Sequence, residues 1–310
     1  MKSRWMLVLV ALIFTATAGY AQWGWGRRRN LQGPLWRTEG GRELVDARTV
    51  QTAREIASHS TDTPEWSNPP GFSRDTFTFC RIIRDGNPEA SPRAGEWITD
   101  FPDSDLNLSF RVQQMTSIKV DPNGRTIRLT DKALFDYPFI YMVEVGSLYL
   151  RDEEVPILRK YLENGGFLMV DDFWGDWQWE TFAEQMKRVF PKLDFVDLPM
   201  DHPIFHSVFD LKGPLNSLQT PNSRQGSASK YDGVTWEEHP YKDGGMQQCI
   251  DMHVRALYDD KGRIMVLATH NCDNGDGWER EGEDDYFFHE FSEKRAFPLG
   301  INIIFYVMTH

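Results

Sequence analysis

The sequence predicts an α/β fold with a doubly wound, mostly parallel sheet, helices on both faces and antiparallel hairpin additions. Two apolar runs without alternation, at residues 139–143 and 167–170, are typical of strands buried on both faces. Amphipathic helical patterns lie between such runs, which is the order expected of a parallel sheet. Two pairs of short β-type segments flank turn sequences and predict hairpins at the sheet edges.

Residues 165–175 are the centre of this prediction. Gly165 and Gly166 follow a helical pattern, where glycine commonly ends a helix. The apolar run 167–170 comes next, and Asp171 and Asp172 follow where the strand leaves the core. Ligands of open parallel sheets bind at that carboxyl end, so this is the expected functional edge.

The remaining elements are predicted from their periodicity and turn signals. In chain order they are a helix within 43–58, a strand at 76–83, a helix at 105–117, a hairpin at 118–129, a strand at 139–143, helices at 152–164 and about 179–189, a short strand at 194–198, a hairpin at 250–269, and a C-terminal helix with Ile301 and Ile304 on its apolar stripe. The first hairpin is predicted from the Asn-Gly turn within 121–124.

The 310 residues divide into three predicted parts. Residues 1–21 have the basic start, apolar centre and small-residue end of a signal peptide, cleaved between Ala21 and Gln22. Residues 22–75 form a partly irregular approach segment, and 76–310 form the α/β domain. Within that domain, 213–248 is rich in Gly, Ser, Asn and Pro and predicts a long excursion or lid.

The signal predicts a periplasmic or otherwise secreted protein. The alternative, an uncleaved anchor, is less favoured because the apolar run is shorter than the ~20 residues of a spanning helix. No second apolar run of that length exists, so no membrane span is expected after signal removal. The formal net charge of −12 disfavours nucleic acid and anionic membranes as partners.

The three cysteines allow one specific prediction. If the second hairpin turns between Asp260 and Lys261, opposite residue numbers sum to 521, and Cys249 faces Cys272. We therefore expect a disulfide between Cys249 and Cys272 and a contact between Asp251 and His270. A role of the thiolates as metal ligands or nucleophiles is the alternative.

Polar residues that follow predicted strands are the expected site. Asp171 and Asp172 are adjacent in an extended segment, so only one can face a given cleft, and we favour Asp172. A structural role as a helix cap is the alternative for either carboxylate. The expected ligand-binding residues are Asp103, Glu144, Asp171, Asp172, Trp174, His202, Asp273, Asp276 and Trp278.

Several of the same residues are candidates for catalysis and for metal binding. Catalytic candidates are Asp172, His202 and His270. The four-residue spacing of His202 and His206 makes these two, with Asp172, the candidate metal ligands. Trp174 and Trp278 stand beside acids, as in sites for a polar, sugar-like ligand; packing at the core edge is the alternative. No specific cofactor is indicated.

Four segments carry a resemblance to a known family. Residues 135–141, 164–175, 201–206 and 275–279 resemble the bacterial domain-of-unknown-function family numbered 4159, over roughly 75–310. That family is similar to class I glutamine amidotransferases and to ThuA-like trehalose-utilisation proteins, which implies a flavodoxin-like sheet and a glutamine amidotransferase-like domain. One departure matters: Phe173 stands where amidotransferases carry their cysteine nucleophile.

Three functions remain open on these grounds. The first is a secreted domain that binds a small polar ligand or a partner at the carboxyl edge of the sheet. The second is a hydrolase-like enzyme that uses Asp172 with His202 or His270, with or without a metal. The third is a non-catalytic interaction module that docks on an envelope protein partner. The empty nucleophile position favours binding over catalysis.

Overall fold

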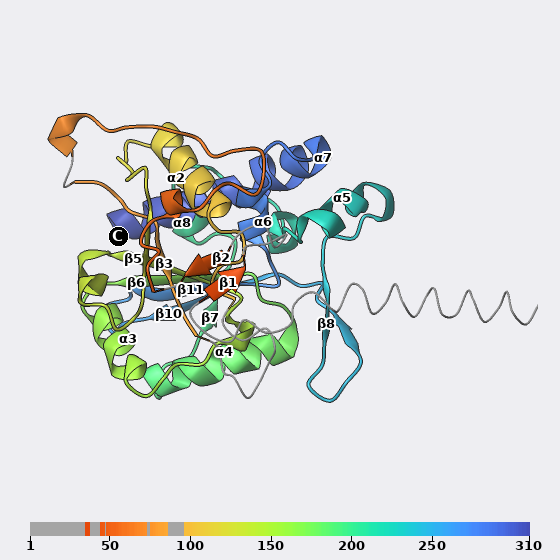
Figure 1. Ribbon diagram of the computed structural model, residues 1–310. Helices are drawn as coiled ribbons and strands as arrows, with labels where there is room; N and C mark the ends of the chain where they lie inside the picture. Colours follow the sequence, from red (N-terminus) through yellow and green to blue (C-terminus); the bar gives the residue numbers. More distant parts are fainter. Residues whose placement is uncertain (1–34, 38–43, 47, 73–74, 86–95) are drawn as a thin grey trace, which may run out of the picture.

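The computed structural model describes residues 35–37, 44–46, 48–72, 75–85 and 96–310 (Figure 1). The predicted signal peptide, 1–21, lies outside the described residues. Among the residues that are described, no helix is both long enough and apolar enough to traverse a bilayer.

A seven-stranded sheet forms the centre of the molecule. Its order is β4 (Arg125–Ile127), β3 (Cys80–Ile82), β5 (Phe139–Val143), β6 (Phe167–Asp171), β11 (Ile264–His270), β10 (His253–Tyr258) and β7 (Val196–Asp197). The first five strands are parallel, whereas β10 runs antiparallel to both β11 and β7. The predicted α/β class, with an antiparallel addition, is confirmed.

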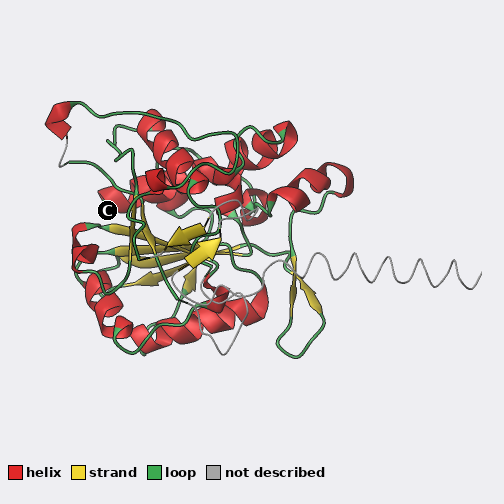
Figure 2. Ribbon diagram, viewed as in Figure 1, coloured by secondary structure: helices red, strands yellow, loops and turns green. Residues whose placement is uncertain are grey.

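Helices cover both faces of this sheet, so the molecule has three layers (Figure 2). On one face lie α3 (Glu154–Glu163) and α4 (Gly175–Val189), and on the other lie α2 (Asp103–Met115) and α8 (Phe297–Thr309) (Figure 1). Side chains of β6 alternate between the two layers: Phe167 and Met169 belong to the core under α2 and α8, and Leu168 and Val170 to the core over α3 and α4. This double burial explains why the run shows no polar alternation.

Smaller elements surround the sheet. They are β1 (Leu35–Arg37), β2 (Leu44–Asp46), α5 (Ser223–Asp232), the hairpin of β8 (Glu238–Pro240) and β9 (Met246–Gln248), α6 (Asn274–Glu279), α7 (Asp285–Phe287), the π-helix η8 (Phe288–Ala296), and the 3₁₀ turns η2 (Ala53–Glu55), η3 (Pro70–Phe72), η4 (Lys132–Asp136), η5 (Val145–Ser147), η6 (Pro203–His206) and η7 (Leu215–Leu218). Val45, Val50 and Ala53 pack with Ile83 and Phe101, so this part of the approach segment is attached to the domain.

Two predicted elements are wrong. The expected hairpin at 118–129 is an interrupted edge strand, because Val120 bridges Phe77 in parallel and β4 then pairs with β3 in parallel. The Asn-Gly turn thus joins two segments that pair with one neighbour instead of with each other. The helix expected within 43–58 does not form either; its described residues contain β2 and the short turn η2.

The hairpin of β10 and β11 forms, but in another register. His253 pairs with His270 and Val254 with Thr269, so opposite residue numbers sum to 523 where 521 was predicted. A β-bulge between Leu257 and Tyr258 contributes one residue of this shift. Consequently Asp251 does not face His270; its backbone oxygen instead accepts a hydrogen bond from Asn271 Nδ2 at 2.7 Å.

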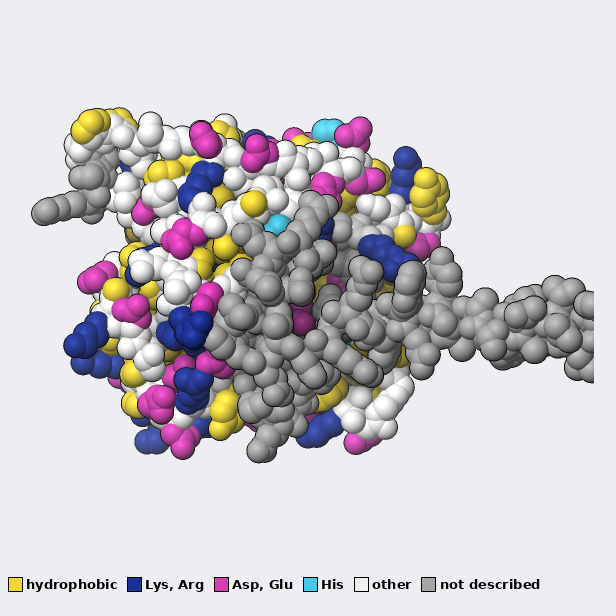
Figure 3. All heavy atoms as spheres, in the orientation of Figure 1, with side chains coloured by type: hydrophobic (Ala, Val, Ile, Leu, Met, Phe, Trp, Pro, Cys, Tyr) yellow, Lys and Arg dark blue, Asp and Glu magenta, His cyan; other side chains and the backbone are white. Residues whose placement is uncertain are grey.

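Basic and acidic side chains are interspersed on the face seen in Figure 3, around the helices of the lower layer. Several of them form ion pairs, such as Arg188 with Asp152 at 2.7 Å. Such exposed pairs contribute little to stability.

Candidate functional site

The carboxyl ends of three neighbouring parallel strands lead into polar residues with left-handed backbones. Glu144 after β5 has φ 56°, Asp172 after β6 has φ 54°, and Asn271 after β11 has φ 58°. Non-glycine residues adopt this conformation at a cost of about 1–3 kcal/mol, and they cluster at sites where the surrounding structure holds them. The edge predicted from the sequence is therefore where three of the described non-glycine residues adopt a left-handed backbone.

Asp171 anchors α6 to the sheet. It is fully buried, and its Oδ1 accepts hydrogen bonds from Asn274 Nδ2 at 2.8 Å and from the Thr269 hydroxyl. Its Oδ2 accepts a hydrogen bond from the backbone N–H of Gly275 at 3.0 Å. Burial raises the pKa of Asp171 to about 6, although these hydrogen bonds oppose the shift. With its oxygens engaged by the protein, Asp171 has a structural role.

Asp172 and Asp273 are the most perturbed carboxylates of this edge. Burial, reinforced by the charge of Glu144, raises the pKa of Asp172 well above its ordinary value. Burial, reinforced by the charge of Asp172, does the same to the pKa of Asp273. Within the described part of the chain, neither carboxylate forms an ion pair with a Lys or Arg; Asp172 Oδ1 accepts a hydrogen bond from Trp174 Nε1 at 3.2 Å.

Three buried carboxylates come together beside Asp172. Asp100 is 1% exposed, Asp273 is 4% and Asp276 is 5%, and each contributes an oxygen to a group whose ligand atoms all lie within 4.8 Å of one another. Asp273 caps α6 by accepting from the N–H of Asp276 at 2.7 Å. Arg280 Nε lies 3.5 Å from Asp276 Oδ1, so one positive charge adjoins this group.

A second group of acidic side chains lies near the start of α2. Asp103, predicted as a ligand-binding residue, lies with His59 and Glu279 in a separate group whose ligand atoms are within 4.8 Å. On α6, Asp276 and Glu279 are three residues apart, and so are Asp100 and Asp103. Asp276 and Glu279 therefore share a face of α6, whereas Asp100 lies in the turn before α2 and Asp103 in the first turn of that helix.

The predicted excursion, 213–248, packs over this edge. Ser223 N–H, at the start of α5, donates to Asp276 Oδ2, and Glu237 Oε1 accepts from Asn222 N–H at 2.8 Å. At the other side, Gln247 Oε1 accepts from the N–H of Asp176 in the first turn of α4 at 2.9 Å. The excursion therefore closes the edge with side chains and backbone groups of its own.

The two predicted tryptophans are buried. Trp174 is 1% exposed and stacks on His239, with ring centroids 6.1 Å apart. Trp278 is 0% exposed, and its Nε1 donates to Ala296 O at 2.9 Å. Trp278 packs in the core, as the alternative prediction had it. Trp174 instead positions Asp172 through its indole hydrogen bond.

The two histidines predicted as catalytic, His202 and His270, do not join the carboxylates of the sheet edge. His270 Nε2 donates to Gly175 O at 3.1 Å and its Nδ1 accepts from Arg255 Nη1 at 3.1 Å. Burial, aided by the charge of Arg255, lowers the pKa of His270 to about 3. His270 is therefore a neutral packing residue.

His202 and His206 lie away from Asp172. His202 Nδ1 accepts from Ile204 N–H and its Nε2 lies 3.4 Å from the hydroxyl of Tyr258. Tyr258 pairs with Ile264 at the start of β11, which is the opposite end of the sheet from Asp172. His206 contacts Asp210 at 2.7 Å on the surface. The predicted metal set of Asp172, His202 and His206 is not brought together.

The predicted disulfide is absent, and the three cysteines are free thiols. The register explains this: β10 begins at His253, so Cys249 lies beyond the hairpin and contacts the carbonyl of Gln247. Cys272 lies beneath the excursion, where its Sγ accepts from Thr220 N–H at 3.4 Å.

Sequence reasoning missed Asp100, Glu237 and His59. None of them follows a strand of the sheet, which was the criterion for choosing site residues. The three-residue spacing of acids in 273–279 places Asp276 and Glu279 on one face of α6. Asp100 lies in a turn outside any helix, so no such spacing signal exists for it.

Comparison with known families identifies one match. The family model described as a domain of unknown function, DUF4159, matches residues 83–308. No curated protein matches the chain.

Proposed function

We propose that this chain, which belongs to the DUF4159 family, binds a small polar ligand at the carboxyl edge of its sheet through a divalent cation held by Asp100, Asp273 and Asp276. The observation that carries this proposal is the burial of three carboxylates, each at most 5% exposed, with oxygens within 4.8 Å. Carboxylate oxygens are the ligands that Ca²⁺, Mg²⁺ and Mn²⁺ prefer.

Electrostatics support a cation at this position. Burying several like charges is costly unless a positive charge offsets them. Asp273 and Asp172 respond by holding protons more tightly, as the raised pKa of each shows. A bound divalent ion would be the largest local charge and would reverse that shift. Cation affinity should therefore fall as the pH is lowered through these raised values.

Two buried oxygens beside Asp273 could complete the coordination. The Oδ1 atom of Asn274 and the Oγ1 atom of Thr220 are fully buried and have no hydrogen-bond partner among the described residues. Thr220 is adjacent because its carbonyl accepts from Asp273 N–H at 2.7 Å. Buried polar atoms are normally satisfied, so an unsatisfied pair beside three carboxylates supports an oxygen-liganded ion.

Binding at the sheet edge is favoured over hydrolysis by the positions of His202 and His270. A general acid or base has to lie within hydrogen-bond reach of the reacting group. His202 is at the opposite end of the sheet, and His270 has both ring nitrogens engaged by Gly175 and Arg255. Asp172, next to the cation group, is the residue that we expect to contact the ligand.

Thermal unfolding with and without Ca²⁺, Mg²⁺ or Mn²⁺ tests the proposal. A cation that binds only the native state at one hundred times its Kd adds about 2.7 kcal/mol of stability. Wild type should respond, and Asp273→Asn should not. Because Asp273→Asn removes a buried like charge, this variant should also be more stable than wild type without cation.

Asp152→Asn is the matched control, because the Asp152 side chain is 99% exposed and lies on the surface. It should respond to cations as wild type does. The polar ligand is then sought by repeating the assay with sugars in the presence of the effective cation. An equal cation response in Asp273→Asn and wild type, or no response in wild type, would refute the proposal.

We also propose that the protein is exported, on the basis of Lys2, Arg4 and the apolar centre of residues 6–14. Fractionation of expressing cells, followed by mass determination, should find the protein outside the cytoplasm with Gln22 as its first residue. Recovery of the full-length chain from the cytoplasm would contradict this.

A further inference from the structure

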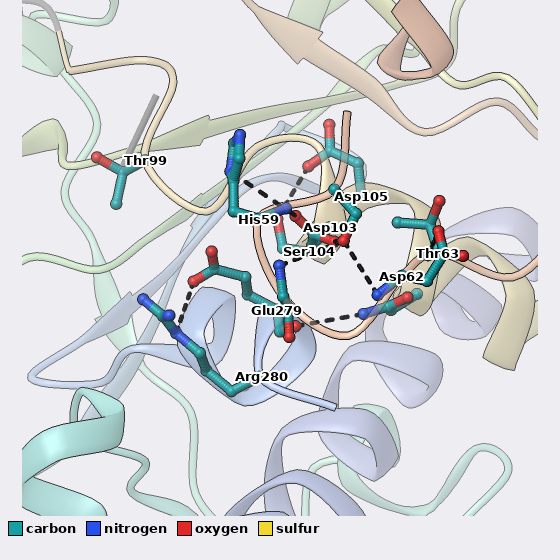
Figure 4. A network of polar contacts seen from close by, with 12 residues as sticks. His59, Asp62, Thr63, Thr99, Asp103, Ser104, Asp105, Glu279 and Arg280 are labelled. Atoms are coloured by element: carbon teal, nitrogen blue, oxygen red, sulfur yellow. Dashed lines mark hydrogen bonds and ion pairs between the residues drawn. The ribbon is translucent and has the colours of Figure 1, made fainter. Parts of the chain in front are cut away.

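A second group of metal-ligating side chains lies one helical turn from the carboxylates described above. Three separate segments contribute to it: His59 from the approach segment, Asp103 from the first turn of α2, and Glu279 from the end of α6. The nearest donor atoms of the three side chains all lie within 4.8 Å of one another. Figure 4 shows them in one polar network, with Arg280 next to Glu279.

The backbone around this group holds two of the side chains in position. Asp103 Oδ2 accepts from the N–H of His59 at 2.8 Å, and the Ser58 hydroxyl donates to Asp103 Oδ1. His59 Nδ1 lies 3.8 Å from Asp103 Oδ2, so the imidazole faces the carboxylate. These contacts fix the loop that carries the histidine on the start of α2, as the outer contacts of metal sites do.

The third side chain is positioned by the contact between α2 and α6. Asn107 Nδ2 donates to Trp278 O at 2.8 Å, which fixes the last turn of α6 against α2. The remaining Asn107 atom, Oδ1, is buried without a hydrogen-bond partner among the described residues. The end of α6 that carries Glu279 is thereby held against α2, close to Asp103.

Burial makes this group different from an ordinary surface network. Asp103 and Glu279 are each 0% exposed, and the His59 side chain is 6% exposed. Arg280 Nε lies 2.9 Å from Glu279 Oε2 and offsets one of the two negative charges. A divalent ion would supply the charge that the second carboxylate requires.

The donor set identifies the class of ion. One imidazole nitrogen with two carboxylate oxygens suits Mn²⁺, Fe²⁺, Co²⁺ or Zn²⁺, whereas Ca²⁺ and Mg²⁺ prefer oxygen alone. Three protein ligands leave at least one coordination position for water or another group. The all-carboxylate group of Asp100, Asp273 and Asp276 lacks the nitrogen, so the two groups should differ in metal preference.

From this geometry we infer that His59, Asp103 and Glu279 form a binding site for a divalent transition metal, separate from the proposed cation site at the sheet edge. The site joins the approach segment to α2 and α6, so the metal also attaches residues near position 59 to the α/β domain. This inference does not depend on whether the sheet edge binds a cation.

Cobalt binding provides the test, because Co²⁺ has a visible absorption spectrum that depends on its ligands. The purified protein is stripped with a chelator at neutral pH and titrated with Co²⁺, and bound metal is counted by elemental analysis. We expect one equivalent at this site with a d–d absorption band. His59→Gln should weaken it at least about tenfold and change the band, since even outer-shell changes cost that much.

Three further variants make the result decisive. Glu279→Gln should also lose the band, whereas His289→Gln, whose imidazole is 63% exposed, should retain it. Asp273→Asn should retain the cobalt band while losing any Ca²⁺, Mg²⁺ or Mn²⁺ response of the sheet edge. If Glu279→Gln fails to fold, His59→Gln alone decides, because this change leaves both buried carboxylates and Arg280 in place.

The competing interpretation is a structural contact between His59 and Asp103 without metal. It predicts that His59→Gln lowers the melting temperature equally with and without Co²⁺. That result, or a cobalt band unchanged by His59→Gln, or no cobalt uptake by folded wild type, would overturn the inference.

Discussion

Gly275 lies against the carboxylate of Asp100: a Cβ atom at position 275 would be 2.0 Å from Asp100 Oδ2. On its other side, the N–H of Gly275 donates to Asp171 Oδ2 at 3.0 Å. The first turn of α6 therefore fits between two carboxylates, one from the loop before α2 and one from β6. Only a residue without a side chain allows this approach, so Gly275 sets the spacing of the acidic group.

Gly275→Ala should displace Asp100 and disturb the proposed cation site. Overpacking of this kind costs about 1–3 kcal/mol, which urea unfolding would measure. The cation-dependent rise in melting temperature should shrink as well. Gly71→Ala is the control, because an added Cβ there meets no atom within 4 Å. A Gly275→Ala protein with wild-type stability and cation response would show that Asp100 can move freely.

The two central strands could be predicted because burial on both faces leaves a simple pattern. The runs 139–143 and 167–170 are continuously apolar, and β5 and β6 occupy Phe139–Val143 and Phe167–Asp171. Register and pairing partners were less predictable, because they depend on neighbours. The bulge at Leu257 and Tyr258 leaves no signal in the sequence, and it contributes to the shift that removed the predicted disulfide.

The site was most predictable where a residue directly follows a strand of the sheet. Asp172 and Asp273 follow β6 and β11, and the rule that ligands bind at carboxyl ends of strands was enough to select them. Asp100 and His59 come from loops that reach the same region through the packing of α2, α6 and the approach segment. Tertiary packing of this kind has no local sequence pattern.

The raised pKa of Asp171 predicts a specific pH dependence of stability. Burial raises the pKa of Asp171 to about 6, above the ~3.9 of an unfolded aspartate, so the folded state binds the proton more tightly. This contribution to the free energy of unfolding is complete below about pH 4 and is lost as the pH rises through about 6. The loss amounts to roughly 3 kcal/mol.

Asp171→Asn should lack this part of the pH dependence. Urea unfolding of wild type and variant between pH 4 and 7 gives the difference in slope. Thr269→Val, which removes a hydroxyl that donates to Asp171, serves as a companion. Because that hydrogen bond lowers the pKa of Asp171, its removal should raise the pKa further and shift the transition to higher pH. Parallel pH profiles for wild type and Asp171→Asn would contradict the assignment.

His270 should stay neutral throughout the physiological range. Burial and the nearby charge of Arg255 lower the pKa of His270 to about 3. The imidazole resonances of His270 should not titrate between pH 5 and 8 in an NMR experiment. A lowered pKa contributes stability that is present above about 6.5 and is lost as the pH falls toward 3. A His270 midpoint near neutrality would reopen its role as a catalytic base.

The free cysteines give a chemical test of the hairpin register. Cys249 is 1% exposed, and Cys80 and Cys272 are 0% exposed. Burial raises the pKa of Cys249 to about 11, which keeps it in the unreactive thiol form at neutral pH. Folded protein should react slowly with a thiol reagent, and denatured, non-reduced protein should titrate with three thiols. A count of one thiol would instead indicate a disulfide, which requires a different register of the hairpin.

Arg81 and Asp105 hold the start of α2 on the sheet. Removing this contact should weaken metal binding at both proposed sites. Arg81 is fully buried on β3; its Nε lies 3.0 Å from Asp105 Oδ1, and its Nη1 donates to the carbonyls of Trp97 and Thr99 at 2.9 Å each. Arg81→Met leaves Asp105 buried without its counter-charge, which costs about 3–5 kcal/mol. Asp100 and Asp103, which lie between Thr99 and Asp105 in the sequence, should then lose their fixed positions.

A double-mutant cycle separates the charge pair from the other contacts. Arg81→Met/Asp105→Leu removes both charges and should recover part of the stability that Arg81→Met loses. Recovery should be incomplete, since the carbonyls of Trp97 and Thr99 lose their donor and an unsatisfied buried group costs about 1–3 kcal/mol. The cation and cobalt responses should weaken in both variants, because each site takes a carboxylate from this end of α2. Wild-type responses in a destabilised but folded Arg81→Met protein would show that the start of α2 is held by other contacts.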